Sequence, residues 1–191
     1  QYYAWALVNR ASLMPTKEAF LKAAKQVEEA REKYKGVIVI DAIVPDYYAK
    51  FPKPCMGGWA RGIVNVTPSG RVLPCHAAES IKTLKFDNIK ERPLADIWLN
   101  GEAFNAYRGT DWMKEPCRSC PRKEIDYGGC RCQAFALTGD AANTDPACSL
   151  SPLHAQWQAV AEVESHNPNV PEFTYRRVGG AAKKPQTHNV S

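Results

Sequence analysis

The sequence lacks any segment of the kind that crosses a membrane. Among its 191 residues no apolar run approaches the roughly 20 residues that a membrane helix needs, and no charged, then apolar, then small-residue leader marks secretion. We therefore expect a cytoplasmic protein with no membrane partner. Because the sequence opens at Gln1, inside an expected strand, we also expect the natural protein to begin further upstream.

The sequence also has little excess charge. Its formal net charge of +5 is spread thinly, except for a basic end formed by Arg176, Arg177, Lys183 and Lys184. Such an end could contact nucleic acid, but its richness in Gly, Ala, Pro and polar residues favours a solvated tail. We therefore expect residues 166–191 to be a disordered tail and predict no nucleic-acid partner.

Cysteine is what the sequence has in quantity, with seven residues that all fall between positions 55 and 148. A secreted disulfide scaffold normally carries an even number of cysteines. The pairs Cys117/Cys120 and Cys130/Cys132 are spaced awkwardly for ordinary bridges, but such spacings are familiar in metal sites. The cysteines therefore indicate metal ligation.

The first fifty residues predict a β-α-β unit. Residues 1–8 are rich in aromatic and β-branched side chains, and residues 37–44 form the near-continuous apolar run of a strand buried on both faces. Between them, Thr16 caps and Gly36 ends a predicted helix. One such unit cannot cover two strands of this kind, so we expect neighbouring parallel strands from an upstream part.

Polar side chains follow both predicted strands. Asn9 and Arg10 come after the first, and Asp46 and Tyr47 come after the second. Folds with parallel strands usually bind ligands at this edge of the sheet. Simple loop polarity explains the same residues equally well, so both interpretations stand.

From about residue 51 the chain changes to short elements rich in glycine and proline. Segments 63–66 and 71–74 flank a predicted β-turn over 67–70, so we expect a hairpin that delivers Cys75 at its exit. Short helices are expected over 93–99 and 103–107. A longer helix begins near Ser151 and should pack back on the first domain.

The cysteine spacing follows a definite order. Cys55 is followed by fourteen residues, Gly70, four residues and Cys75; later come Cys117-x2-Cys120-x5-Asp126-x3-Cys130 and then Cys148. This order resembles the SPASM domain, which follows the barrel in radical S-adenosylmethionine (SAM) enzymes that modify peptides. One position departs from the family, because Asp126 stands where the family usually has cysteine.

The resemblance extends to short segments, namely WALVNRASLMPT, CMGGWARG, RVLPCHAAE and EPCRSCPRKEIDYGGCRCQAFAL. These are similar to the members of the family that act in pyrroloquinoline quinone biosynthesis, and the similarity covers residues 1 to about 165. It implies an α/β fold in which residues 1–50 end a partial radical SAM (β/α)6 barrel and residues 51–150 form a small α+β SPASM domain. Residues 151–165 would form a C-terminal helix.

The resemblance also implies two auxiliary iron–sulfur clusters, 2Fe-2S or 4Fe-4S in type. Seven cysteines and one carboxylate supply eight ligands, which is enough for two sites of four. Mapping the family's ligation gives one site from Cys55, Cys75, Cys130 and Cys132, and another from Cys117, Cys120, Asp126 and Cys148. Cys132 has no counterpart in the wider family.

The activity that the resemblance implies joins the side chains of a glutamate and a tyrosine in a precursor peptide by a carbon–carbon bond. Its expected partners are that peptide, a peptide-binding chaperone and an external electron donor. The C-x3-C-x2-C motif whose 4Fe-4S cluster cleaves SAM does not occur in the sequence. We expect it, with SAM, in an upstream half, and we assign no catalytic residue here.

Two other classes of protein remain open at this point. A zinc-stabilised binding domain would use the same thiolates, with His76 as an additional candidate ligand, and a stand-alone electron-transfer module would need only the clusters. Four cations lie among the ligands, where they could offset cluster charge or merely be solvated: Arg118, Arg122, Lys123 and Arg131.

Overall fold

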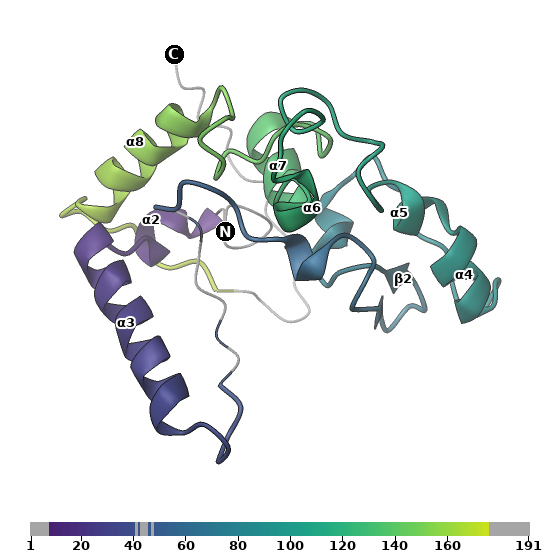
Figure 1. Cartoon of the computed structure of the whole chain (residues 1–191), viewed down its shortest axis with the longest axis horizontal. Coiled ribbons are helices and arrows are strands. Elements are labelled where there is room, and N and C mark those ends of the chain that lie inside the picture. Colours follow the sequence, from purple (N-terminus) through teal and green to yellow (C-terminus); the bar gives the residue numbers. More distant parts are fainter. Residues whose placement is uncertain (1–7, 41, 43–45, 47, 176–191) are drawn as a thin grey trace.

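The computed structural model describes residues 8–40, 42, 46 and 48–175 (Figure 1). Its helices are α2 (Arg10–Leu13), α3 (Lys17–Lys33), α4 (Leu94–Asn100), α5 (Glu102–Asn105), α6 (Lys123–Asp126), α7 (Arg131–Thr138) and α8 (His154–Ser165). Two 3-10 turns, η1 (Cys55–Gly57) and η2 (Ala78–Ser80), and two strands, β1 (Asn65–Val66) and β2 (Val72–Leu73), complete the elements. The expected strand over 1–8, apart from Val8, and most of the expected tail lie outside the described residues.

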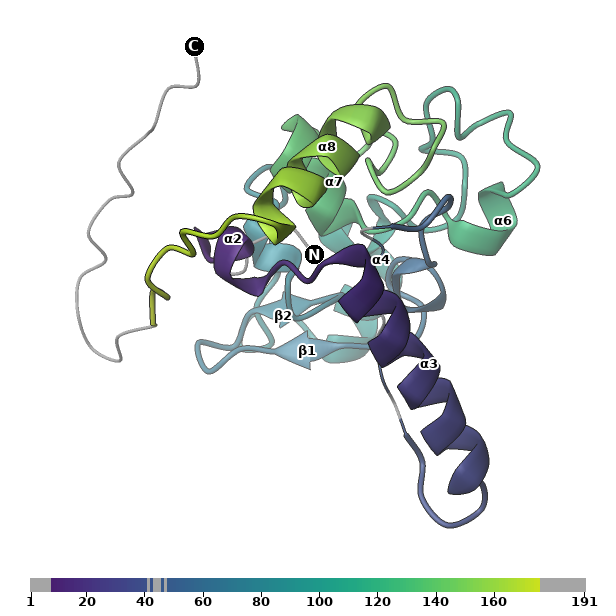
Figure 2. The same ribbon diagram turned by 90° about the vertical axis from the view of Figure 1, so that its left-hand side faces the viewer.

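Helix α3 forms as its capping residues predict. The Thr16 hydroxyl accepts a hydrogen bond from the Ala19 amide at 3.2 Å, which satisfies one of the free N–H groups of the first turn. At the other end Gly36 has a φ of +79°, a conformation that favours glycine after a helix. The helix projects away from the rest of the molecule in both views (Figures 1 and 2).

The strand predicted for 37–44 is wrong for the described part of that segment. Residues 37–40 and 42 are turn or irregular, and the side chains of Val37, Ile38 and Val39 are 77%, 57% and 95% exposed. A strand apolar on both faces needs paired neighbours and covering layers. The described residues supply neither, so the predicted barrel portion is not found among them.

The polar residues after the first predicted strand have structural partners instead. Asn9 precedes α2, and its side-chain amide exchanges two hydrogen bonds with the backbone of Thr174, at 3.1 and 2.7 Å. Arg10 forms an ion pair with Glu164 at 2.6 Å. Both residues therefore hold the end of the described chain against α2.

The predicted hairpin is confirmed, with shorter strands. β1 pairs antiparallel with β2, with Asn65 opposite Leu73 and Val66 opposite Val72 (Figure 2). Gly70 closes the turn with a φ of +91°. The side chains of Val72 and Leu73 are completely buried, so the hairpin leads directly from the core to Cys75.

The core lies among the hairpin, η2, α4, α5 and α7. Its largest buried side chains are Trp59, Val72, Leu73, Ile81, Ile97 and Phe104. Cys75 and Cys132 belong to this core, and Cys55 and Cys130 pack against it. Four cysteines are thus part of the apolar interior.

Helix α8 forms as predicted and packs against α2, where Met14 and Ala161 are buried with Trp157 beside them. This contact joins the last described helix to the beginning of the described chain. None of the described helices is both long and apolar enough to cross a membrane.

Candidate metal centres

Four cysteines from three separate segments meet beside the core, and we call them the first quartet: Cys55, Cys75, Cys130 and Cys132. Cys55 begins η1, where Met56 and Gly57 both have positive φ and turn the chain sharply. Cys75 follows β2, while Cys130 caps the start of α7. The structure therefore brings together the four residues predicted for one site.

The thiols of the first quartet are hydrogen-bonded to one another. Cys132 is hydrogen-bonded with Cys130 and Cys75, and Cys55 is hydrogen-bonded with Cys130. These interactions lower the pKa of Cys75 to about 6 and hold the pKa of Cys130 well below its usual range, while they raise the pKa values of Cys55 and Cys132. The quartet thus favours thiolate at two of its four positions even without a bound metal.

The other predicted ligands line a single small cavity, and we call them the second quartet: Cys117, Cys120, Asp126 and Cys148. Lys123 and Leu150 also line this cavity. Burial raises the pKa values of Cys117 and Cys148, and the neighbouring acidic groups of the quartet raise them further. The structure therefore brings together the second predicted set as well.

Asp126 lies at the end of α6 and is 6% exposed. Its Oδ1 accepts a hydrogen bond from the Gly128 amide at 3.1 Å, and its Oδ2 pairs with the Arg122 guanidinium at 3.3 Å. The carboxylate thus caps the turn that leads to Cys130 and also lines the cavity of the second quartet.

The donor chemistry of both quartets suits iron–sulfur clusters, which take thiolates that converge from several loops, four to a site. Within the part of the chain that the structure describes, no group of three or more His, Cys, Asp or Glu side chains is arranged to hold a metal ion. His76, the alternative zinc ligand, is exposed and lies outside the cavity of the second quartet.

The four cations predicted near the ligands differ in their surroundings. Arg118 is exposed, Arg122 pairs with Asp126, and Lys123 lines the cavity. Arg131 is only 1% exposed. The sequence had left open whether Arg131 is a solvated loop charge, and the structure shows that it is buried. Asp145, which is also completely buried, gave no signal in the sequence.

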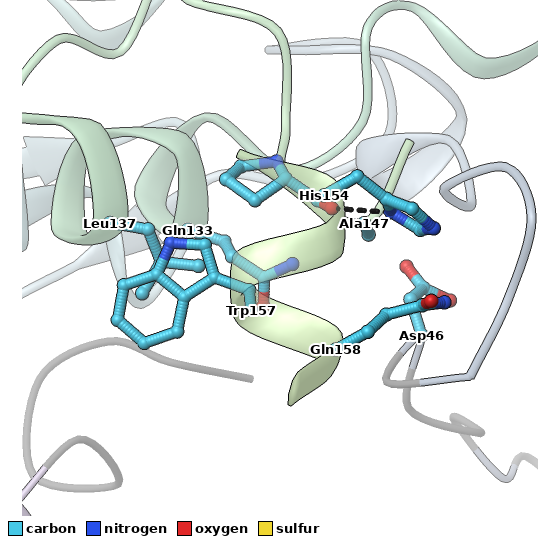
Figure 3. Close-up of a pocket in the computed structure, with 8 residues that line it drawn as sticks. Asp46, Gln133, Leu137, Ala147, His154, Trp157 and Gln158 are labelled. Carbon is cyan, nitrogen blue, oxygen red and sulfur yellow. Dashed lines mark hydrogen bonds between the residues drawn. The ribbon is translucent and has the colours of Figure 1, made fainter. Parts of the chain in front are cut away.

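A further small cavity is lined by residues of both α7 and α8 (Figure 3). Asp46 lines it, as do Gln133, Trp157 and His154, whose Nδ1 is hydrogen-bonded to the Pro146 carbonyl at 2.9 Å. Burial raises the pKa of Asp46. The residue singled out after the second predicted strand therefore does line a cavity, whereas Tyr47 lies outside the described residues.

The comparison with known protein families defines the class of site. Residues 55–121 match the SPASM family, described as an iron–sulfur cluster-binding domain. The match begins at Cys55 and includes Cys75, Cys117 and Cys120, so it contains members of both quartets. Residues 55–121 are thus similar to an iron–sulfur cluster-binding domain, whereas Cys130, Cys132 and Cys148 lie beyond the match.

Comparison with individual curated proteins narrows the class of protein that the chain resembles. The chain is 64% identical over all 191 residues to the PqqA peptide cyclase of Methylobacterium sp. (strain 4-46) and 62% identical to that of Methylobacterium nodulans. It is 59% identical over 185 residues to that of Methylorubrum extorquens (strain PA1). The chain spans about half the length of these curated relatives. The predicted resemblance to the C-terminal half of the peptide-modifying enzymes of pyrroloquinoline quinone biosynthesis is confirmed.

Proposed function

We propose that this chain is the part of a PqqA peptide cyclase that carries two auxiliary iron–sulfur clusters. The first quartet would hold one cluster and the second quartet the other. The observation that carries the proposal is the division of all seven cysteines and Asp126 into two groups of four, each assembled from distant segments. This division is what two four-ligand clusters require.

The chemistry of the complete enzyme gives the clusters a task. Joining the side chains of a glutamate and a tyrosine by a carbon–carbon bond removes two hydrogens, and hence two electrons, from the peptide. Reductive cleavage of SAM accounts for the removal of one hydrogen atom, so a further electron needs an acceptor. Bound iron–sulfur clusters supply one-electron redox chemistry.

The residues of this chain would prepare both sites for that task. The first quartet lies against the apolar core, which keeps water from its thiolates. The second quartet lies beside Arg122 and Lys123, whose positive charges offset the negative charge of thiolates and carboxylate. The two sites thus differ in the means by which they stabilise charge.

The partners follow from the same proposal. The relatives are named for their action on PqqA, so we propose this peptide as the substrate. A peptide-binding chaperone and an external electron donor complete the proposed set. All seven cysteines are free thiols, and such thiols persist in the reducing cytoplasm, where we place the protein.

The proposal is tested by analysing the chain after anaerobic reconstitution. We expect a brown protein with iron and acid-labile sulfide for two clusters, and one cluster fewer in the Cys117→Ser/Cys120→Ser variant. A colourless protein that binds zinc and no sulfide would show instead that the quartets belong to a zinc-stabilised domain.

A second measurement separates a part of the cyclase from a stand-alone electron-transfer module. The 191 residues contain no C-x3-C-x2-C motif, and all their cysteines are assigned to the two quartets. We therefore expect no 5′-deoxyadenosine when the reconstituted chain is incubated with SAM and a reductant. Restored peptide cross-linking when this segment replaces its counterpart in a relative would support the proposal, whereas failure with both clusters intact would favour the stand-alone module.

A further inference from the structure

Arg131 joins the two cluster sites from one side. Its backbone lies between Cys130 and Cys132 of the first quartet. Its guanidinium, in contrast, donates to the carbonyls of Gly128, Ala141 and Asn143, the last two at 2.7 and 2.9 Å, in the loops beside the second quartet. A buried guanidinium is costly to desolvate, so these bonds fix both loops around it.

The ring of Trp112 completes this arrangement, because the Arg131 guanidinium carbon lies 4.7 Å from the ring centroid. A cation over an indole face is stabilised by the ring quadrupole. Arg131 is therefore held in one position by contacts on several sides.

Asp145 joins the same two sites, but its backbone contacts the second quartet and its side chain contacts the first. Its backbone carbonyl accepts a hydrogen bond from the amide of Cys148, a member of the second quartet, at 2.8 Å. Its side chain reaches the first quartet, where Oδ2 accepts from the Cys130 amide at 2.7 Å and Oδ1 accepts from Gln133 at 3.0 Å. The carboxylate thus holds the N-terminus of α7 and the cysteine that begins it.

The close approach of these two segments depends on Gly129 and Thr144. A side chain at position 129 would place its Cβ 2.6 Å from Asp145 Oδ2, and the residue has a φ of +81°, so glycine is required. Thr144, next to Asp145, is hydrogen-bonded through Oγ1 to Cys117 Sγ at 3.4 Å. The loop that carries Asp145 therefore contacts two ligands of the second quartet and one of the first.

We propose that Arg131 and Asp145 form a reciprocal pair of positioning residues that couples the two cluster sites, so that a change at either residue alters both clusters. The proposal rests on the proposed function, since it concerns clusters bound at both quartets. The backbone of Arg131 belongs to the first site and its side chain contacts the loops beside the second. The backbone of Asp145 contacts the second site and its side chain contacts the first. Displacing one side chain must therefore move ligands of both quartets.

Electrostatics adds to this coupling. The Arg131 side chain is 1% exposed, so water screens its positive charge little. This one buried cation lies beside both sites and therefore acts on the charge of both. A cation near a cluster favours the reduced, more negative state.

The first test uses Asp145→Asn in the reconstituted chain with both clusters bound. Asparagine has nearly the same shape as aspartate, but its side-chain nitrogen donates a hydrogen bond where a carboxylate oxygen of Asp145 accepts one. We expect both clusters to release iron to a chelator about tenfold faster, which corresponds to about 1.4 kcal/mol. The matched control is Asp140→Asn in the same loop, because that carboxylate accepts hydrogen bonds from Lys114 and the Ala142 amide. Asp140→Asn should leave both rates unchanged.

The second test uses Arg131→Met, which keeps a long side chain and removes the charge. We expect the reduction potentials of both clusters to fall together by about 59 mV, which is a tenfold change in a one-electron reduction equilibrium. The separate paramagnetic resonance signals of the two clusters measure the two potentials. The matched control is Arg108→Met. Arg108 also donates to two backbone carbonyls, those of Ala60 and Trp98, and lies over the indole ring of Trp98. None of these partners belongs to either quartet.

A measurement on the unaltered chain guards against variants that fail to fold. If the two sites open as one unit, the buried amides of Cys130 and Cys148 exchange their hydrogens at rates within about tenfold of each other. Rates further apart, or variants in which only one cluster changes, would overturn the coupling while leaving two clusters in place. Absence of clusters from the unaltered chain would instead contradict the proposed function.

Discussion

The two quartets differ in how the protein surrounds them. The first quartet consists of thiols that contact one another and the apolar core, and Cys132 within it is completely buried. The second surrounds a cavity, replaces one thiol by the Asp126 carboxylate and has charged side chains on its wall. The first site is therefore part of the hydrophobic core, whereas the second is a loop-built site that depends on charge and hydrogen bonds.

This difference teaches that similar cysteines have unequal structural roles. A residue of the first quartet is part of the core as well as a proposed ligand, so its loss should cost stability even when no cluster is bound. A partly exposed residue of the second quartet contributes little to the core, so its loss should mainly affect the proposed cluster. The following experiments test this contrast, from the largest expected effect to the smallest.

The largest effect is expected for Cys132→Ala. The change removes the thiol that is hydrogen-bonded with Cys130 and Cys75, and it leaves a small void at a completely buried position. We expect the first cluster to be lost and the free energy of unfolding of the cluster-free chain to fall by about 1–3 kcal/mol. Urea unfolding monitored by tryptophan fluorescence measures this, and an unchanged midpoint would show that the first quartet is not part of the core.

The next effect is a pH dependence of the cluster-free chain. The Cys132 thiol lowers the pKa of Cys75 from its ordinary 9.0 to about 6, so the folded chain loses this proton at a lower pH than the unfolded chain. Between pH 6 and 9 the unfolded chain binds more protons. Stability should therefore rise with pH in this window, by at most about 1.4 kcal/mol for each pH unit, and be lost as the pH falls through 6.

Thiolate absorbance near the ultraviolet edge should show the same transition, with a midpoint near pH 6. Cys75→Ser should remove the absorbance step near pH 6 and reduce the slope of stability with pH, to which Cys130 also contributes because its pKa is lowered as well. An unchanged slope in that variant would show that the pH dependence does not arise from Cys75. The thiols of Cys117 and Cys148 should titrate above their ordinary range, since burial raises their pKa values.

A smaller effect is expected for the carboxylate of the second quartet. We expect Asp126→Cys to keep the second cluster and lower its potential, because thiolate donates more charge to iron than carboxylate does. We expect Asp126→Ala to leave a labile or three-iron cluster. The control is Glu124→Ala, on the exposed face of α6. Spectra and potentials like those of the unaltered chain in both Asp126 variants would reduce the role of Asp126 to capping its turn.

The smallest effect is expected for Cys120→Ala in the cluster-free chain. Its side chain is partly exposed, so we expect the free energy of unfolding to change by less than about 0.5 kcal/mol. The same variant should nevertheless lose the second cluster after reconstitution. A loss of stability as large as that of Cys132→Ala would remove the distinction between a core site and a loop site.

Local signals in the sequence were sufficient for several elements. The Thr16 cap defined the start of α3, and the turn residues over 67–70 defined the hairpin and its delivery of Cys75. The grouping of the ligands came from the family resemblance and the ligand count, and the structure assembles both groups. Whether the grouped residues bind clusters stays a prediction.

Other features depended on contacts that a sequence pattern does not contain. The apolar run over 37–44 indicates what the segment would need in order to be a strand, but the described residues supply no neighbour. The burial of Arg131 depends on carbonyls of loops that close around it from residues 128–129 and 141–143. Asp145 precedes Pro146, which predicts a turn, but nothing local predicts its reach to Cys130.

The order of the quartet members along the chain has a consequence for how the two sites assemble. Cys117, Cys120 and Asp126 lie within residues 117–126, whereas Cys55 and Cys130 are brought together only by closing a long loop. Loop closure costs more entropy as the loop lengthens. Three members of the second quartet therefore need little ordering of the chain to meet, whereas the first quartet comes together only as the core around Cys75 and Cys132 closes.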